Sequence, residues 1–403
     1  MNILFLTFTK IDDINERGIY SDLARIFKKK GHHITIVCPV ERREKSKTQF
    51  IKKESYSLLR VWGFNYRNTN ILEKTLGFFA TEYQYYHSVK KHLKATKFDL
   101  IFYSTPPITF LKTINYIKKR DNAFTYLLLK DIFPQNAVDL KYIKKNSLMY
   151  HIFREKEKKL YDVSDMIGCM SQANMDYILE NNTSIKKSKL EINPNSIEPL
   201  HINISDDRKI EIRQKYKIPE DKMVIVFSGN CGKPQGIDFL LNFIKKNTNT
   251  NAFFLIVGDG TEFKKIKNWH TQSKLLNVLI LNKLQKKEFD ELLSACDVGL
   301  ILLSKDFTIP NFPQRLLSYL EMHLPVIAAT DTATDVGNII EEANCGYKIN
   351  FGDSEAFQQK IEYLYNNSET FHEMKKNSWK LLNDKYLVNV SYQAIIKHIE
   401  SKM

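Results

Sequence analysis

Short apolar runs alternate with helix-length amphipathic stretches along the chain, and the whole pattern occurs twice. In the first half, strand-like composition is found at residues 3–9, 34–37, 100–103, 124–129 and 166–170, and a helix is expected at 18–30. In the second half it returns at residues 224–227, 253–257, 278–281, 298–303 and 326–329, with helices such as 237–246 between the strands. Parallel strands need crossover helices, so this alternation predicts parallel βαβ units. We expect an α/β protein with two doubly wound Rossmann-like domains that face a central cleft.

A break separates the two halves. Residues 193–199 combine turn-forming residues with two prolines, and a polar stretch follows as far as Asp207. Such composition is typical of a domain boundary. We expect an N-terminal domain at 1–200, a C-terminal domain at 201–385, and a final helix at 386–403 that packs back on the N-terminal domain.

Charge and cysteine content restrict the class of protein. The 403 residues include 60 Lys and Arg against 46 Asp and Glu, a formal net charge of +14, which favours an acidic partner. The five cysteines form no CxxC pair, and there is no D-x-D, H-x-H or H-x-x-x-H motif. This spacing fits a reducing compartment and predicts no metal site. The apolar run at residues 3–8 is too short for a signal peptide or a membrane span, so we expect a cytoplasmic location.

Three βα turns in the second half have the composition of anion-binding sites. The first comprises residues 228–236. It contains Lys233 and three glycines, Gly229, Gly232 and Gly236, which allow close approach of the backbone to a ligand. The second is Gly258-Asp259-Gly260. Either segment is also compatible with an ordinary turn, with Asp259 as a helix cap.

The third turn leads into a helix that begins near Pro313. Arg315 lies in the first turn of that helix, where a guanidinium adds to the positive end of the helix dipole and can bind a diphosphate in bidentate fashion. Ser318 follows one turn later on a similar face. The alternative is a solvated arginine. Three such turns at the carboxyl ends of strands in one domain fit the rule that ligands bind there in open sheets.

Several motifs resemble the retaining glycosyltransferases of the GT-B fold, family 4, and in particular bacterial O-antigen and capsule transferases that use nucleotide-activated amino sugars. The N-terminal part of this resemblance comprises Asn2–Phe5, Gly18 with the following helix, Ser104-Thr105-Pro106-Pro107 and Lys130-Asp131-Ile132-Phe133-Pro134. The C-terminal part comprises the glycine turns, residues 295–300, Phe312-Pro313-Gln314-Arg315 with Tyr319-Leu320, and residues 325–328. The order and spacing of these pieces extend over nearly the whole chain.

The resemblance implies a metal-independent transferase that moves an N-acetylated sugar from a nucleotide-sugar, most simply a UDP-sugar, and needs no cofactor. The donor would bind the C-terminal domain at Gly229, Asn230, Gly232, Lys233, Gln235, Gly258, Asp259, Gly260, Lys283, Gln314, Arg315, Leu316, Ser318 and Tyr319. A polyprenyl-diphosphate-linked saccharide acceptor would bind the N-terminal domain at Gly18, Thr105, Pro106 and Asp131. Arg315 and Asp131 are the candidate catalytic residues, and Asp131 is equally compatible with a turn cap.

Retention with no convincing second carboxylate favours front-face transfer assisted by the leaving phosphate over double displacement. Two departures from the family pattern stand out. Pro310 and Ser318 occupy the positions of the usual E-x7-E pair, and Asn230 and Gln235 those of the usual Arg and Lys. Arg315 and Lys233 would supply the missing positive charge.

Aromatic and basic residues in the first half indicate a peripheral contact with the inner, anionic face of the cell membrane. The aromatic residues are Phe78, Phe79, Tyr83, Tyr85 and Tyr86, in an expected helix at 70–94. The basic residues are Lys90, Lys91, Lys94, Lys118, Lys119, Arg120, Lys141, Lys144, Lys145, Arg154, Lys156, Lys158 and Lys159. The alternative is that the aromatic rings belong to the core and the lysines to solvated faces.

Three other functions remain open at this point. A sugar-nucleotide epimerase of the same fold would share the nucleotide site but use no acceptor. A basic nucleic-acid-binding protein would account for the charge, although no RNP, zinc-finger or basic-zipper pattern is present, and we expect no nucleic-acid partner. A non-catalytic assembly subunit is compatible with the missing Glu pair.

Overall fold

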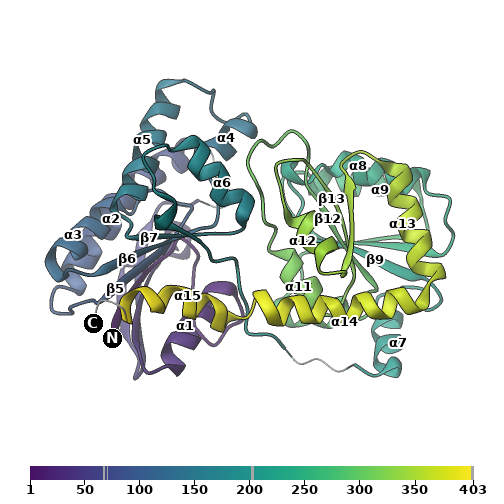
Figure 1. Ribbon diagram of the computed structural model, residues 1–403, viewed down its shortest axis with the longest axis horizontal. Helices are drawn as coiled ribbons and strands as arrows, with labels where there is room; N and C mark the ends of the chain where they lie inside the picture. Colours follow the sequence, from purple (N-terminus) through teal and green to yellow (C-terminus); the bar gives the residue numbers. More distant parts are fainter. Residues whose placement is uncertain (67–68, 70, 201–203, 401–403) are drawn as a thin grey trace. The chain divides into compact units, whose positions relative to one another are not determined.

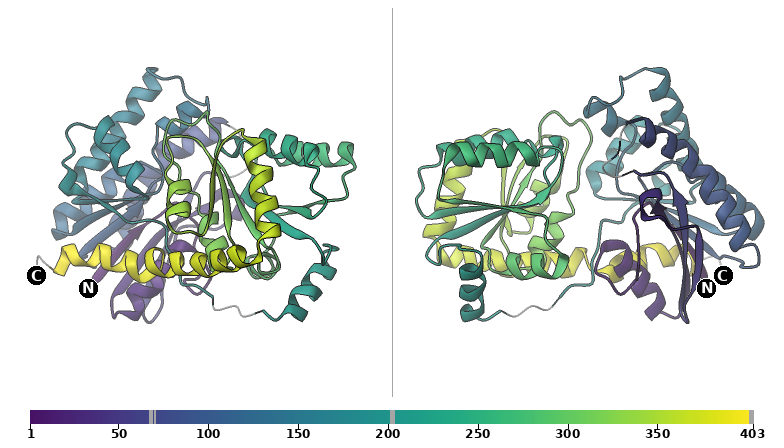
Figure 2. Two further views of the ribbon diagram at one scale, coloured as in Figure 1. Left: turned by 45° about the vertical axis from the view of Figure 1, so that its right-hand side comes forward. Right: turned by 180° about the vertical axis from the view of Figure 1, so that it is seen from behind.

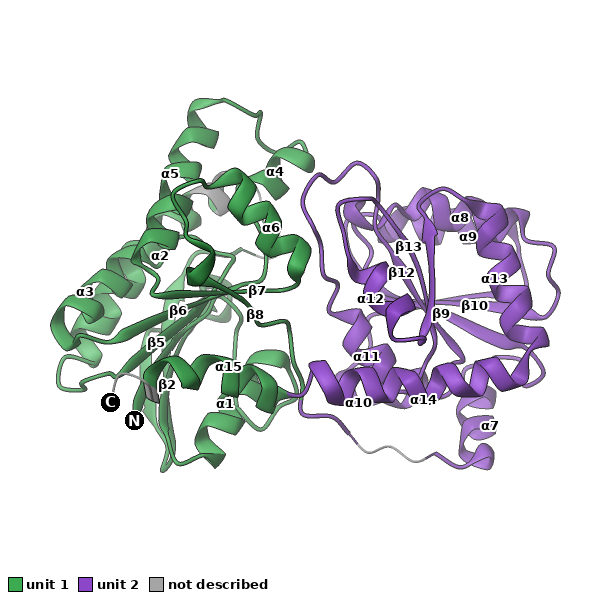
Figure 3. Ribbon diagram, viewed as in Figure 1, with its two compact units in different colours: residues 1–197, 388–403 green, residues 198–387 purple. Residues whose placement is uncertain are grey.

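The computed structural model describes residues 1–66, 69, 71–200 and 204–400, and the chain divides into two compact units (Figures 1 and 3). Unit 1 comprises Met1–Ile197 with Val388–Met403, and unit 2 comprises Glu198–Leu387. Each unit contains its own mainly parallel sheet. The structure thus confirms the predicted α/β class with two Rossmann-like domains.

The sheet of unit 1 has the strand order β3-β4-β2-β1-β5-β6-β7-β8, in which β3 alone pairs antiparallel among the described strands. Its strands are β1 (Asn2–Leu6), β2 (His33–Glu41), β3 (Gln49–Lys52), β4 (Tyr56–Gly63), β5 (Leu100–Ser104), β6 (Phe124–Leu129), β7 (Met166–Cys169) and β8 (Leu190–Ile192). Its helices are α1 (Ile19–Lys29), α2 (Ile71–His92), α3 (Leu111–Asp121), α4 (Gln135–Asp139), α5 (Leu148–Val163), α6 (Gln172–Asn181) and α15 (Val388–Glu400), with short 3-10 turns at Arg42–Glu44 and Lys187–Lys189.

Helix α15 completes the core of unit 1 although it comes from the other end of the chain. It packs beside α1, where the ring of Tyr392 lies 5.0 Å from that of Phe27, and its buried residues Ile395, Ile396 and Ile399 join the same apolar cluster. The expected boundary residue 201 and the chain end at 403 lie outside the described residues. The described chain crosses between the units at Ile197/Glu198 and Leu387/Val388.

The sheet of unit 2 is entirely parallel in the described residues and has the order β11-β10-β9-β12-β13-β14. Its strands are β9 (Met223–Asn230), β10 (Ala252–Asp259), β11 (Val278–Asn282), β12 (Val298–Leu302), β13 (Val326–Thr330) and β14 (Gly346–Asn350). Its helices are α7 (Asp206–Lys215), α8 (Ile237–Lys246), α9 (Phe263–Ser273), α10 (Lys286–Ser294), α11 (Arg315–Glu321), α12 (Val336–Glu342), α13 (Ser354–Asn366) and α14 (Ser368–Lys385), with a 3-10 turn at Lys233–Gln235.

Helices cover both faces of the unit 2 sheet, as Figure 2 shows. One face packs against α8, α9 and α13 through residues such as Phe243 and Phe357, whose rings lie 4.3 Å apart. On the other face, Tyr319 of α11 lies directly over Gly299 of β12, where a Cβ atom would come within 2.5 Å of the ring. The glycine therefore brings α11 close to the sheet and fixes the position of the residues at its start.

Candidate functional site

The strand order of unit 2 places a switch point between β9 and β12, because the chain proceeds to one side from β9 to β11 and to the other from β12 to β14. Ligands of open α/β sheets bind at the carboxyl ends of the strands beside such a point. The loops that follow β9 and β12 meet there, since the amide of Ser304 donates to the carbonyl of Pro234 at 2.8 Å. The switch point is therefore where a site is expected from topology alone.

The two glycine turns predicted from the sequence pack together as one structure. The amide of Cys231 donates to the carbonyl of Asp259 at 2.6 Å, and the amide of Glu262 donates to the carbonyl of Cys231 at 2.9 Å. At Gly258 a Cβ atom would lie 1.9 Å from the carbonyl oxygen of Gly229. Only glycine allows this approach, so residues 229–231 and 258–262 hold each other in place.

Arg315 joins these turns from α11. Its Nη2 donates to the carbonyl of Asn230 at 3.1 Å, and its Cζ lies 4.4 Å from the centroid of the Phe227 ring. Its Nη1 is buried and has no hydrogen-bond partner in the described residues, and no carboxylate there lies within ion-pair distance of it. Burial lowers the pKa of the guanidinium, but arginine stays charged in proteins. The result is a fixed cation with an unused donor.

Tyr319 anchors Arg315 from one helical turn away. Its hydroxyl accepts from the amide of Ser228 at 3.1 Å and donates to the carbonyl of Val226 at 3.3 Å. Tyr319 and Leu316 are both fully buried, so their side chains belong to the core that supports the site, and their contact with the donor stays a prediction. Ser318 is half-buried and Gln314 is exposed.

The remaining predicted donor residues divide between structural and exposed positions. Gln235 is buried and its Oε1 accepts from the amide of Gly232 at 3.0 Å, so this side chain holds its own turn, and its contact with the donor stays a prediction. Gly236, at φ 55°, begins α8, which no side chain caps. Lys233 is exposed, and Lys283 faces Asp259 across an exposed ion pair of 4.0 Å.

In unit 1, two of the predicted acceptor residues lie together. The hydroxyl of Thr105 donates to the carbonyl of Asp131 at 3.1 Å and accepts from the amide of Lys130 at 3.2 Å, so it ties the ends of β5 and β6 to each other. Pro106 follows Thr105 and is exposed. Gly18 forms hydrogen bonds with Asp22 of α1, and no hydrogen bond among the described residues joins it to Thr105 or Asp131.

The carboxyl of Asp131 accepts from the amide of Ile132 at 2.8 Å and from the side chain of Asn136. This is the turn cap that the sequence left open as an alternative. Burial nevertheless raises the pKa of this carboxyl to about 6. Asp131 thus combines a structural role with a carboxyl that titrates near neutral pH.

Lys130 belongs to the segment 130–134 but was not predicted as an acceptor-binding residue. Its Nζ donates to the carbonyl of Asn193 at 3.1 Å, and burial lowers its pKa to about 7. A lysine and an aspartate directly after a buried strand are the sequence signal that would have pointed to it. The carboxyl end of β6 therefore carries an acid and an amine that both change charge between about pH 6 and pH 7.

Of the aromatic and basic residues predicted to contact a membrane, some are buried or paired inside unit 1 and others are exposed. Tyr85 is buried and its hydroxyl donates to the carbonyl of Thr7 at 2.9 Å, so it belongs to the core. Four of the basic residues are engaged inside unit 1, with partners that include Asp165, Asp121, Glu157 and Glu82; these are Lys118, Arg120, Arg154 and Lys156. Exposed positions are Phe79, Tyr83 and the lysines at 90, 91, 94, 119, 141, 144, 145, 158 and 159.

The comparisons with known proteins agree with this geometry. Residues 208–381 match the family described as glycosyl transferases group 1. These residues contain every element of the unit 2 site. The match supports glycosyltransferase activity.

One curated relative extends the similarity beyond that region. The chain is 24% identical over 279 residues to WbjE of Pseudomonas aeruginosa, described as a probable glycosyltransferase, which covers 69% of this chain and 68% of the relative. Among solved structures, HepE of Anabaena in complex with UDP aligns with a TM-score of 0.68 and 14% identity over all of both chains. WaaG, described as a glycosyltransferase involved in lipopolysaccharide biosynthesis, aligns with a TM-score of 0.67 and 14% identity over 98% of each chain.

Together, the matches support a glycosyltransferase with the GT-B fold, and they favour it over the epimerase and nucleic-acid alternatives. Within the described residues, no cluster of three His, Cys, Asp or Glu is placed to hold a metal ion, and no helix is long and apolar enough to cross a membrane. Metal independence stays a prediction.

Proposed function

We propose that the chain transfers an N-acetylated sugar from a UDP-sugar to a polyprenyl-diphosphate-linked saccharide in bacterial surface polysaccharide synthesis, with retention and without a metal ion. The observation that carries this proposal is Arg315, an enclosed guanidinium with an unused Nη1 at the meeting point of three βα turns. Arg315 is half-buried, and its buried Nη1, without a hydrogen-bond partner in the described residues, is costly unless a ligand completes it. A diphosphate supplies the oxygens that fit its planar donor geometry.

The chemistry follows from where charge develops. As the bond between the sugar and the diphosphate lengthens, negative charge grows on the departing phosphate. Donors that are already fixed stabilise that charge without reorganising during the reaction. Arg315 is fixed by Phe227 and Asn230, and the first turn of α8 offers backbone amides without a capping side chain. The leaving phosphate is then the group that assists attack of the acceptor hydroxyl on the same face of the sugar.

The relatives support the choice of donor and acceptor. HepE is described with bound UDP, and WaaG is described as acting in lipopolysaccharide biosynthesis. We assign the acceptor to the carboxyl edge of the unit 1 sheet, where Thr105 and Asp131 lie together. With a pKa near 6, Asp131 is mainly ionised at neutral pH and is suited to orient or deprotonate the acceptor hydroxyl.

We also propose that the chain binds the membrane surface, through a contact region that differs from the one expected from the sequence. Helices α2 and α5 lie side by side and run in the same direction, because Phe79 contacts Phe153 and, three residues later in both, Glu82 pairs with Lys156 at 2.6 Å. Both helices present exposed apolar side chains. We name these the α2–α5 face: Leu76, Phe79 and Tyr83 of α2 with Leu148, Met149 and Ile152 of α5.

Exposed Lys141, Lys144 and Lys145 directly precede α5, so the α2–α5 face combines apolar and basic groups as an anionic leaflet requires. Leu148, with 79% of its surface exposed, is the most direct probe. Leu148→Glu should weaken flotation with anionic liposomes. Absence of wild-type binding to such liposomes at low salt would remove this part of the proposal.

Arg315→Ala tests the proposal at its centre. Loss of a hydrogen bond to a charged group costs about 1.5–3 kcal/mol, so UDP affinity measured by calorimetry should fall about 10- to 150-fold. Turnover of the donor should fall at least as far. Arg208→Ala is the matched control, since Arg208 is an exposed arginine of unit 2 that pairs with Glu211 and Glu291. If folded Arg315→Ala protein binds UDP as tightly as the parent, the diphosphate lies elsewhere.

A further inference from the structure

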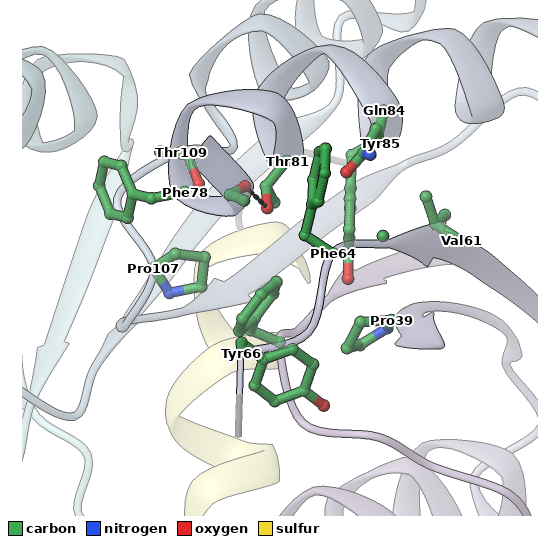
Figure 4. A pocket seen from close by; sticks show the side chains of 13 residues that line it. Pro39, Val61, Phe64, Tyr66, Phe78, Thr81, Gln84, Tyr85, Pro107 and Thr109 are labelled. Atoms are coloured by element: carbon green, nitrogen blue, oxygen red, sulfur yellow. Dashed lines mark hydrogen bonds between the residues drawn. The ribbon is translucent and has the colours of Figure 1, made fainter. Parts of the chain in front are cut away.

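Unit 1 contains a cavity of about 270 Å³ at the carboxyl edge of its sheet, beneath α2 (Figure 4). Phe78, Thr81, Gln84 and Tyr85 of α2 line it. Most of its wall is apolar, and it contains the rings of Phe8, Phe64, Tyr66, Phe78, Tyr85, Pro39 and Pro107. The cavity lies beside the switch point of this sheet, because Phe8 follows β1 and Pro107 follows β5.

The polar groups of this wall are mostly engaged within the protein. Thr81 donates to the carbonyl of Gly77 at 2.7 Å, and Tyr85 donates to the carbonyl of Thr7 at 2.9 Å. The exceptions are Thr109 and Gln84. The side chain of Thr109 is completely buried and its Oγ1 has no hydrogen-bond partner in the described residues, and the carboxamide of Gln84 borders the cavity. The wall therefore offers a ligand mainly apolar contacts, one unused hydroxyl and one carboxamide.

These wall groups suit one part of a lipid-linked saccharide, the lipid, better than the other part, the sugar. A sugar ring carries several hydroxyl groups, and the side chains of Thr109 and Gln84 are too few to replace the water that all of these groups would lose in such a cavity. A hydrocarbon chain loses nothing there and gains the burial of its surface. One hydroxyl in the wall matches one oxygen at the point where such a chain joins its phosphate.

The position of α2 adds an independent argument. One side of this helix borders the cavity through Phe78, Thr81 and Gln84, while Leu76, Phe79 and Tyr83 are exposed on another side. The exposed side belongs to the α2–α5 face. The same helix thus connects the surface proposed to meet the bilayer with a cavity suited to a hydrocarbon chain.

We propose that this cavity binds the phosphate-proximal hydrocarbon segment of the lipid-linked acceptor. The inference rests on the proposed function, in which the acceptor is linked to a lipid phosphate. It extends that function by assigning the lipid, and not the saccharide, to this cavity. A cavity of about 150 Å³ holds a benzene ring, so this one accommodates about ten carbons. Thr105 and Pro106, assigned to the acceptor, directly precede its wall residue Pro107.

Binding of short lipid phosphates to the full chain tests the assignment without requiring transferase activity. Titration calorimetry would compare geranyl phosphate and decyl phosphate, which have isoprenoid and straight chains of equal carbon number, with inorganic phosphate and free N-acetylglucosamine. We expect both lipid phosphates to bind at least tenfold more tightly than inorganic phosphate, since burying two methylene groups already provides that factor. The tighter of the two identifies the kind of chain.

Gly63→Leu is the variant that fills the cavity. Gly63 lines the wall, and a Cβ atom there meets only Gln84 Oε1 at 3.4 Å, an ordinary contact. Lipid phosphate affinity should fall at least tenfold in this variant, while UDP affinity should stay unchanged because UDP is assigned to unit 2. Gly63→Ala, a smaller change, should reduce the affinity less and serves if the leucine variant does not fold.

The outcomes separate this inference from the proposed function. If UDP binds but the lipid phosphates bind no better than inorganic phosphate, or bind Gly63→Leu equally well, the cavity assignment is wrong and the transferase proposal stands. If N-acetylglucosamine binds and Gly63→Leu prevents it, the cavity holds the saccharide and the assignment is overturned. If UDP itself does not bind, the proposed function is wrong, and the cavity assignment, which rests on it, is overturned with it.

Discussion

The switch points of the two sheets share one topology and differ in chemistry. In unit 2, the ends of β9 and β10 carry glycine turns, and α11, which follows β12, adds the guanidinium of Arg315. In unit 1, the ends of β1 and β5 carry aromatic rings around a cavity, with Asp131 and Lys130 at the end of β6. The fold therefore fixes where a ligand binds, and the residues directly after the strands decide which kind of ligand it is.

The two edges are also held together in different ways. Backbone hydrogen bonds and close glycine contacts hold the turns of unit 2, as at Gly258 and Cys231. In unit 1 a side chain, Thr105, joins the ends of β5 and β6. Substitutions should consequently disturb the first edge through lack of space and the second through lost hydrogen bonds.

The largest effect is expected at Gly258. In Gly258→Ala the new Cβ would overlap the carbonyl of Gly229, so β9 and β10 must separate at their ends. We expect a loss of about 3 kcal/mol of unfolding free energy, with UDP binding lost as well. Gly18→Ala is the matched change in unit 1, where nothing lies within 4 Å of the added atom. Chemical denaturation of both variants provides the comparison, and equal stability would show that the two edges do not differ in packing.

A smaller, pH-dependent effect is expected at Asp131. Its pKa is about 6 in the folded chain against a usual value of 3.8, so folding favours the protonated form. The folded state then binds more protons than the unfolded state between these values, and stability falls as pH rises through that range. Relative to Asp131→Asn, the parent should lose at most about 2 kcal/mol between pH 4 and pH 6.

Asp165→Asn provides a control of opposite sign. Although burial opposes ionisation of Asp165, hydrogen bonds from Lys118 and Thr125 lower the pKa of this carboxyl. The parent should therefore lose stability relative to this variant as pH falls. Denaturation curves from pH 3 to pH 7 for the three proteins measure both slopes, and parallel slopes would contradict the assignment.

The smallest effect is expected from removing single hydroxyl groups. Tyr319→Phe in unit 2 and Tyr85→Phe in unit 1 each delete a buried hydrogen bond to a backbone carbonyl, at about 1 kcal/mol of stability. Only Tyr319→Phe should also weaken UDP binding by a few-fold, because Tyr319 holds Ser228 at the end of β9. Equal UDP affinity in the two variants would mean that the hydrogen bond between Tyr319 and Ser228 does not affect UDP binding.

The sequence alone was sufficient for the fold class and for the buried strands of unit 2. Runs such as residues 224–227 and 326–329 are apolar because both faces of a parallel strand are covered. The strands at Gln49–Lys52, Tyr56–Gly63, Leu190–Ile192 and Gly346–Asn350 were not predicted. Three of them lie at a sheet edge and contain polar or exposed residues, and in Tyr56–Gly63 the polar residues Ser57 and Arg60 interrupt the apolar run, so none gives a continuous apolar signal.

The candidate site was predicted in part for a related reason. Glycines that follow strands are visible in a sequence, and so is an arginine that begins a helix. The burial of Leu316 and Tyr319 depends on which side of α11 meets the sheet, and Gln235 is occupied by a contact within its own turn. The cavity of unit 1 was not predictable in this way, because its wall combines residues from separate segments between Phe8 and Thr109.

The return of the chain to unit 1 affects the order in which the protein can fold on the ribosome. The amide of Val388 donates to the carbonyl of Ile197 at 2.9 Å, and α15 then supplies Tyr392 and Ile395 to the first unit's core. Unit 2, in contrast, is continuous from Glu198 to Leu387. The domain that is synthesised second therefore has all its residues first, and the N-terminal one waits for the last helix before its interior closes.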